Sequence, residues 1–139
     1  MVVETAAGGI LFLLARVLLG GVLAFTGLNH FSDVEGMAGY AGAKGLPAPK
    51  LAVVASGVLL VFSGLGIVLG VVPVIAAGAA AVFLLVSAVT FHDFWAVPDD
   101  QAQTEMTQFL KNVALAGGTL AFVALGGQAW PYAVGIGLF

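Results

Sequence analysis

The chain has 139 residues, of which 61% are hydrophobic and 8% are charged, and its net charge is −3. A soluble domain carries roughly 25% charged residues, so this composition excludes a water-exposed globule and predicts an integral membrane protein. The negative net charge argues against nucleic acid as a partner. The chain has no cysteine, which excludes disulfides, zinc thiolate sites and iron–sulfur clusters, so a redox role would need a borrowed cofactor.

Four apolar stretches are long enough to cross a bilayer, which takes about 20 residues. They lie near residues 6–28, 51–70, 73–92 and 107–127. The first stretch lacks a basic start and contains Arg16, so we expect it to be retained rather than cleaved as a signal peptide. The expected fold is all-α, a four-helix transmembrane bundle that forms a single domain over residues 1–139.

A short helix is expected between the first and second spans. Ser32 followed by Glu35 is typical of a capping box, and the segment 34–43 then runs to Gly45 and Pro47, where a helix would end. Its mixture of apolar and polar residues favours a helix that lies in the membrane interface.

Polar residues concentrate at one end of the expected bundle, which we call the polar end. Short connections place the end of the first span, the end of the third and the start of the fourth on the same side of the membrane. Both histidines, His30 and His92, therefore approach each other there. The loop lysines Lys44, Lys50 and Lys111 also lie on that side, so the positive-inside rule predicts that the polar end faces the cytoplasm.

Arg16 lies near the middle of its span, where an arginine costs about 2.5 to 3.5 kcal/mol on insertion scales. Gly20, Gly27 and His30 share its helix face, so we expect that face to point into the bundle. An alternative is that the side chain reaches back toward the first interface and donates to backbone carbonyls.

The polar end supplies most of the candidate binding residues. The candidates are Arg16, Asn29, His30, Asp33, His92, Asp93, Lys111 and Asn112. For the histidines, helix capping is the alternative interpretation. We expect no metal site, because His30 and His92 come from different helices and neither has a second histidine four residues away.

Several motifs make the chain resemble the small membrane proteins of the DoxX family. The motifs are Phe91-His92-Asp93-Phe94-Trp95, Gln108-Phe109-Leu110-Lys111-Asn112, Gly117-Gly118, and the series Arg16, Gly20, Phe25, Gly27 and His30. The sequence departs from the family at Ala55-Ser56-Gly57, where many relatives carry an acidic residue. The resemblance implies a link to quinone-dependent membrane oxidoreductases, whereas more distant relatives are thought to act as cargo receptors or assembly chaperones.

Three functions are compatible with these patterns. The first is a subunit or partner of a membrane oxidoreductase that holds a quinone or similar headgroup at the polar end, with His30 and His92 as hydrogen-bond donors and Asp33 and Asp93 fixing their tautomers or relaying protons. The second is a non-enzymatic scaffold or assembly factor, and the third is a small permease with Arg16 as its selectivity element. Whether the protein is an enzyme stays open.

The expected location is the plasma membrane of a prokaryote, with several membrane crossings and with lipid as the surrounding partner. Homo-oligomerisation is also expected, because small residues outnumber those that one bundle needs for its own packing. The residues in question are Gly8, Gly9, Ala76 to Ala81, Gly126 and Gly127.

Overall fold

The computed structural model describes residues 2–137, and within them the regular secondary structure is helical. The elements are a 3-10 turn (Val2–Glu4), α1 (Ala6–Ser32), α2 (Val34–Ala43), α3 (Pro49–Leu69), α4 (Pro73–Phe91) and α5 (Asp99–Ala124). The all-α prediction is confirmed. Three of these helices, α1, α3 and α4, are long and apolar enough to cross a membrane. The chain is therefore a multi-pass membrane protein, while the crossing by α5 and the interfacial position of α2 stay predictions.

The boundary between α1 and α2 differs from the expected one. The helix cap is Asp33 rather than Ser32, because Asp33 has the non-helical φ of −145° and its carboxylate accepts from the Gly36 amide at 3.0 Å. Ser32 is the last residue of α1, and its hydroxyl donates to the Asn29 carbonyl at 2.7 Å. A single residue thus separates a helix of 27 residues from one of 10.

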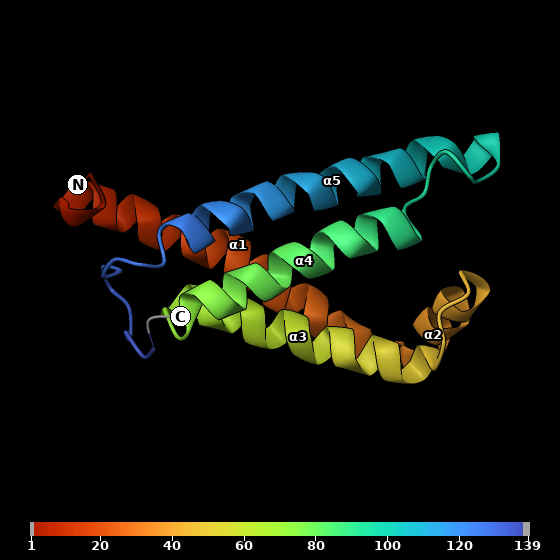
Figure 1. Cartoon of the computed structure of the whole chain (residues 1–139), viewed down its shortest axis with the longest axis horizontal. Coiled ribbons are helices and arrows are strands. Elements are labelled where there is room, and N and C mark those ends of the chain that lie inside the picture. The colour runs from red at the N-terminus through yellow and green to blue at the C-terminus, as the bar shows by residue number, and fades with distance from the viewer. Residues whose placement is uncertain (1, 138–139) are drawn as a thin grey trace.

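The helices pack as two antiparallel pairs, α1 with α3 and α4 with α5, and the two pairs meet along α3 and α4. Figure 1 shows this arrangement, with α2 at one end of the molecule and both chain termini at the other. The helix α2 packs mainly on α3, whereas α1 and α5 make few contacts with each other. The end that carries α2 is the polar end, and we call the opposite end the far end.

Glycines bring α1 and α3 close together, because a residue without a side chain lets two helix backbones approach. A Cβ on Gly20 would lie 2.5 Å from the Gly64 carbonyl oxygen, and a Cβ on Gly27 would lie 2.7 Å from that of Gly57. Each pair is reciprocal, since a Cβ on Gly64 or Gly57 would in turn meet the backbone of α1. Two glycines seven residues apart on each helix therefore set how closely the two axes approach.

Most of the small residues that suggested an oligomer pack inside this one chain. Gly8 faces the Val2 carbonyl, Gly9 faces Pro131, and Gly126 faces Val74. The α4 alanines at 76, 77, 80 and 81 are buried in the core. Gly127 differs from the other glycines of that group, because no atom lies within 4 Å of the place where its Cβ would be. Homo-oligomerisation stays a prediction, but fewer of these small residues are available for contacts with a second copy.

Candidate functional site

A cavity of about 770 Å³ lies at the polar end, between the two helix pairs. All five helices contribute to its wall, which is largely apolar and includes Leu23, Leu60 and Leu84. Five of the candidate residues line it, namely His30, Asp33, His92, Lys111 and Asn112. Ligand sites in proteins typically occupy about 300 to 1,000 Å³ and combine apolar walls with a few polar groups, so this cavity has the size and lining of such a site.

His30 is carried by the last turn of α1 and is 9% exposed. Its Nδ1 lies 2.8 Å from the Ser56 hydroxyl of α3 and 3.4 Å from the Val53 carbonyl oxygen. The Ser56 hydroxyl donates to the same Val53 carbonyl at 2.9 Å. The close approach at Gly57 makes this possible, because a Cβ there would meet the His30 side chain. The ring is thus held in one orientation at the cavity wall.

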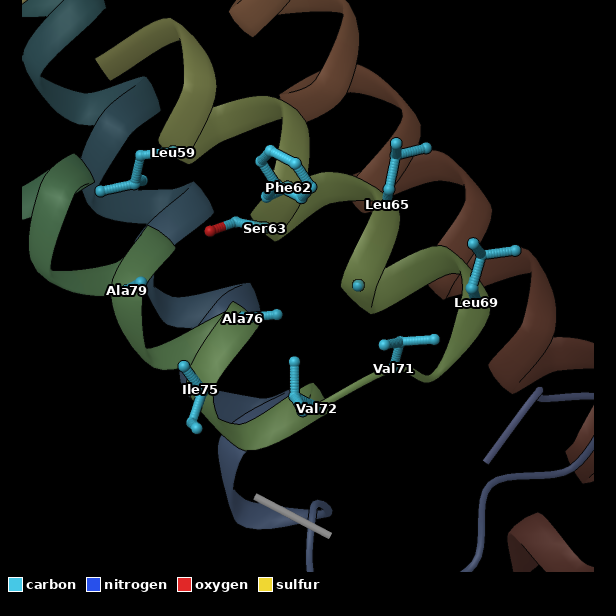
Figure 2. A pocket seen from close by; sticks show the side chains of 11 residues that line it. Leu59, Phe62, Ser63, Leu65, Leu69, Val71, Val72, Ile75, Ala76 and Ala79 are labelled. Atoms are coloured by element: carbon cyan, nitrogen blue, oxygen red, sulfur yellow. The ribbon is translucent and has the colours of Figure 1, made fainter. Parts of the chain in front are cut away.

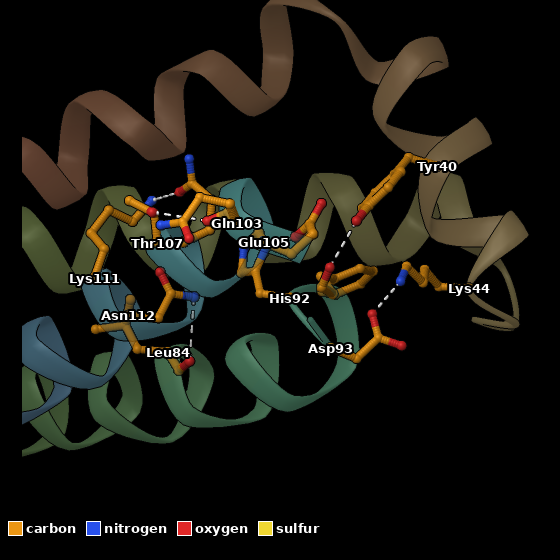
Figure 3. Close-up of polar contacts among 12 residues, drawn as sticks. Tyr40, Lys44, Leu84, His92, Asp93, Gln103, Glu105, Thr107, Lys111 and Asn112 are labelled. Carbon is orange, nitrogen blue, oxygen red and sulfur yellow. Dashed lines mark hydrogen bonds and ion pairs between the residues drawn. The ribbon is translucent and has the colours of Figure 1, made fainter. Parts of the chain in front are cut away.

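His92 follows the last residue of α4, and its Nδ1 lies 2.8 Å from a carboxylate oxygen of Glu105 on α5. The two side chains are 21% and 18% exposed. Figure 3 shows this pair beside the Asn112 and Lys111 side chains. The sequence suggested that Asp33 or Asp93 would be the carboxylate that orients an imidazole. For His92 the carboxylate is instead that of Glu105, in the first turns of α5.

Asp33 and Asp93 have other partners. Asp33 caps α2, as described above, and Asp93 forms an ion pair with Lys44 at the end of α2. The Lys44 ammonium lowers the pKa of Asp93, and the same hydrogen bond raises the pKa of Lys44. Asp93 does not belong to the cavity wall. It fastens α2 to the loop after α4.

Tyr40 makes a second link between α2 and α4. Its hydroxyl donates to the Phe91 carbonyl at 2.7 Å, and the two rings lie 6.1 Å apart. Phe91 ends α4, so its carbonyl has no partner within the helix. Burial and then the negative charge of Glu105 raise the pKa of Tyr40. The phenol therefore stays protonated and keeps donating across the neutral range.

Lys111 and Asn112 both lie on α5 but differ in burial. Asn112 is 5% exposed, and its side-chain amide donates to the Leu84 carbonyl in the middle of α4 at 3.4 Å. Lys111 is exposed, and its ammonium donates to Gln108 at 2.6 Å. Asn29 is exposed on α1 and is not among the cavity residues. His30 and His92 therefore have separate hydrogen-bond partners, Ser56 with Val53 for the first and Glu105 for the second.

Arg16 is fully buried, but it lies at the far end of the molecule from the histidines. Its guanidinium donates to the carbonyls of Ile67 and Val68 on α3 and to those of Pro131 and Tyr132 in the C-terminal segment, at 2.6 to 3.2 Å. Arg16 faces inward, as its helix face predicted, and it also donates to backbone carbonyls, as the alternative predicted. It does not join the other candidates.

The carbonyls at the end of α3 explain why an arginine is needed there. A helix leaves its last four carbonyls without partners in the helix. Gly66 accepts from the Val71 amide at 2.9 Å and Leu69 from the Val134 amide at 2.8 Å. Arg16 takes the two carbonyls between them. The cation also suits the negative end of the helix dipole, and its contacts join α1 to the end of α3 and to the C-terminal segment.

A second hollow, of about 420 Å³, lies between α3 and α4 at the far end. Figure 2 shows that its wall is formed by apolar side chains such as Phe62, Leu69 and Ile75, with the Ser63 hydroxyl as a polar exception. It lacks the titratable groups of the polar-end cavity, which makes it the weaker candidate for a specific site. Among the described residues, no group of three histidine, aspartate or glutamate side chains is placed to hold a metal ion.

Comparison with known proteins gives the chain its family. The family model described as DoxX matches residues 11–93, which is more than half of the chain. The chain belongs to the DoxX family. It is also 30% identical over 121 residues to the inner membrane protein YphA of Escherichia coli strain K12, and that alignment covers 87% of this chain and 86% of YphA. No solved structure matches the chain.

The family match covers the part of this DoxX protein that runs from α1 to the loop after α4. His30 and His92 fall inside the matched region, whereas Glu105, Lys111 and Asn112 fall beyond it on α5. The cavity is therefore built partly by the region that the family model recognises and partly by a helix outside it.

Three residues that shape the site were missing from the candidates chosen from sequence. Ser56 and Glu105 orient the two imidazoles, and Tyr40 closes α2 against α4. Ser56 lies in the Ala55-Ser56-Gly57 segment, where the sequence departs from the expected family pattern, and that departure was a usable signal. The pairing of Glu105 with His92 depends on how α5 is rotated about its axis, which its sequence alone does not indicate.

Proposed function

We propose that this DoxX protein is a subunit or partner of a membrane oxidoreductase and holds a quinone-like lipophilic ligand in the polar-end cavity. The observation that carries the proposal is that both histidines, from helices far apart in sequence, line one apolar cavity of about 770 Å³. An aromatic headgroup needs an apolar slot with a few hydrogen-bonding groups at its rim. The cavity provides both.

The residues present suit a quinone or quinol. His30 and His92 lie on separate helices and would contact the polar groups of a headgroup, while Leu23, Leu60 and Leu84 would pack against its ring. A quinone supplies two-electron, two-proton redox chemistry when bound. The imidazoles are suited to exchange the protons, because a ring nitrogen can accept a proton or donate one. The electrons would come from a partner with its own cofactor, since this chain has no cysteine with which to ligate a metal cluster.

The proposal includes α5 as a fourth span, with α2 in the membrane interface. Four observations support it: α5 is 26 residues long, packs along α4, carries Asp99 and Asp100 in its first turn, and is followed by a segment that pairs with the far end of α3. A helix of that length reaches about 39 Å at 1.5 Å per residue. The charged first turns would lie outside the hydrocarbon. The relative YphA is named as an inner membrane protein, which supports the plasma membrane of a prokaryote as the location.

The test is to purify the protein in mild detergent and to identify the lipids extracted with it. We expect a quinone to copurify in stoichiometric amount and to be lost from His30→Ala and His92→Ala. A matched control is Ser63→Ala, which changes the far-end hollow and should retain the quinone. Each variant should first be shown to unfold at a temperature close to that of the unchanged protein.

The second candidate function is a scaffold or assembly factor, and it predicts the opposite result in this test. No quinone would then copurify or bind when added, and a partner protein would be recovered instead through α2, whose Gly39 faces open space. Equal quinone content in all the variants would also contradict the proposed site.

A further inference from the structure

The hydrogen bonds of His30 fix which of its ring nitrogens carries the proton. Its Nδ1 lies within 3.4 Å of the Val53 carbonyl, and a carbonyl can only accept. The Ser56 hydroxyl, 2.8 Å from the same nitrogen, already donates its hydrogen to that carbonyl. With the Ser56 hydrogen placed on that carbonyl, Nδ1 is the donor to both oxygens. In the neutral ring, Nε2 then has no hydrogen and is a free acceptor.

His92 reaches the same state through a different partner. Its Nδ1 lies 2.8 Å from a carboxylate oxygen of Glu105, and an ionised carboxylate only accepts. Nδ1 is again protonated, so the neutral ring presents Nε2 as an acceptor. The two imidazoles that line the cavity are thus held in one tautomer by two unrelated sets of contacts.

Other polar side chains in the wall also donate to backbone carbonyls. The single hydrogen of the Tyr40 hydroxyl goes to Phe91 at 2.7 Å and that of the Thr26 hydroxyl to Val22 at 2.8 Å, while the Asn112 amide donates one of its two hydrogens to a carbonyl of α4. Their oxygens keep free lone pairs. The wall is consequently rich in acceptors.

Donors also remain in the wall. The exposed Lys111 ammonium donates one of its three hydrogens to Gln108, and the Asn112 amide keeps one of its two, while the Asp33 carboxylate accepts. The hydroxyls of Ser87 and Thr90, which also line the cavity, can act either way. At the two imidazoles, however, a ligand that brings its own hydrogens complements the wall better than one that brings only carbonyl oxygens.

From this pattern we infer that the cavity selects a lipophilic ligand by its hydroxyl hydrogens, which His30 and His92 accept at Nε2. The class is a phenol or a hydroquinone, so the reduced form of a quinone is the form that binds more tightly. The inference rests on the proposed function, because it assumes that the cavity holds a ligand. It reverses the donor role that the sequence suggested for both histidines.

The first test compares three redox-inert probes by equilibrium binding in detergent or nanodiscs. The probes are an alkylresorcinol, the alkylphenol that lacks one hydroxyl and the alkylbenzene that lacks both. A neutral hydrogen bond contributes a net 0.5 to 1.5 kcal/mol, so each hydroxyl should tighten binding by about two- to tenfold. His30→Ala and His92→Ala should each remove the advantage of one hydroxyl and leave alkylbenzene binding unchanged, while Ser63→Ala should change nothing.

The outcomes separate this inference from the proposed function. Equal affinity for the three probes, or tighter binding of a quinone than of its quinol, would overturn the inference and leave the ligand site standing. If no probe and no quinone binds, the proposed function fails and the inference fails with it.

A second test reads the tautomers directly and needs no ligand. Heteronuclear NMR of protein labelled in the histidine rings, recorded at a pH where the ring nitrogen shifts show the neutral form, should show both rings protonated at Nδ1 and not at Nε2. Glu105→Gln should keep this state at His92, since an amide oxygen also accepts. A ring protonated at Nε2 in the unchanged protein would overturn the inference for that histidine.

Discussion

At the residue scale, buried polar groups in this protein are satisfied mainly by backbone carbonyls at or near helix ends. Arg16 takes the last carbonyls of α3, Tyr40 takes the Phe91 carbonyl that ends α4, and Asn112 takes a carbonyl in the middle of α4. In lipid, no water is available to satisfy such groups, and each unpaired one costs several kcal/mol. Arg16 and Tyr40 therefore link helix ends to other elements, and Asn112 links α5 to the middle of α4.

Arg16→Lys should destabilise the protein although it keeps the charge. A lysine ammonium is a compact point donor and cannot span the four carbonyls that the guanidinium contacts. The loss of one charged hydrogen bond is worth roughly 1.5 to 3 kcal/mol. Thermal unfolding in detergent should show a lower midpoint, and limited proteolysis should cut residues 125–137 faster. Ligand affinity at the polar end should not change, and a specific loss of affinity with unchanged stability would assign Arg16 to the site after all.

Gly20→Leu and Gly21→Leu form a matched pair of neighbours on α1. A Cβ at Gly20 would lie 2.5 Å from the Gly64 carbonyl oxygen, whereas nothing lies within 4 Å of one at Gly21. Overpacking costs about 1 to 3 kcal/mol, sometimes more, so Gly20→Leu should lower the unfolding temperature. Gly21→Leu should leave it unchanged or raise it slightly, because leucine is the better helix former. Equal effects of the two changes would show that α1 and α3 are not in close contact there.

At the scale of elements, α2 is the part of the cavity wall that makes the fewest contacts with the pair of α4 and α5. It packs on α3 and reaches the end of α4 through Tyr40 and Lys44. Local opening free energies are lowest where few contacts hold an element. The helix is therefore the element expected to move when a ligand enters.

Asp93→Asn should loosen α2 by removing the partner of Lys44. Hydrogen exchange of the α2 amides is expected to speed up by about two- to fivefold, because a partly exposed ion pair contributes only modestly to stability. Ser63→Ala serves as the control at the far end. Unchanged exchange in Asp93→Asn would mean that the ion pair does not hold α2.

The same ion pair predicts how α2 responds to pH. The pKa of Asp93 is lowered below its ordinary 3.8, so the stability that it contributes is present above that value and is lost as the pH falls through the lowered pKa. The pKa of Lys44 is raised above 10.5, so its contribution is present below that value and is lost as the pH rises through the raised pKa. Between these limits, the protection of α2, corrected for intrinsic exchange, should not depend on this pair. A step near neutral pH that persists in Asp93→Asn would point to another group.

At the scale of the whole molecule, topology was the part that sequence predicted best. Alternating apolar spans and short connections were sufficient to place His30 and His92 at the same end, and the structure puts both on one cavity. The partners of buried groups were harder to predict. Arg16 contacts backbone carbonyls, and because every residue has one, the sequence does not indicate which of them will accept a hydrogen bond. The contact between Glu105 and His92 depends on how α5 is rotated about its axis.

Four crossings would place Lys44 and Gln128 on opposite sides of the membrane. With three crossings by α1, α3 and α4 and α5 lying outside the bilayer, the two positions would share a side. The chain has no cysteine, so single substitutions Lys44→Cys and Gln128→Cys can be labelled in whole cells with a reagent that does not cross the membrane. We expect position 128 to react from outside and position 44 only after the cells are opened. Labelling of both positions from the same side would reduce the number of spans.

We propose that the polar-end cavity, and not the far-end hollow, holds the ligand. Photolabelling with an azido-quinone, followed by mass spectrometry of the labelled peptides, distinguishes these two positions. We expect labels on residues of the cavity wall near His30, His92 and Asn112, with competition by a quinol at lower concentration than by the corresponding quinone. Labels confined to the segment from Phe62 to Ile75, or labelling that no competitor reduces, would contradict it.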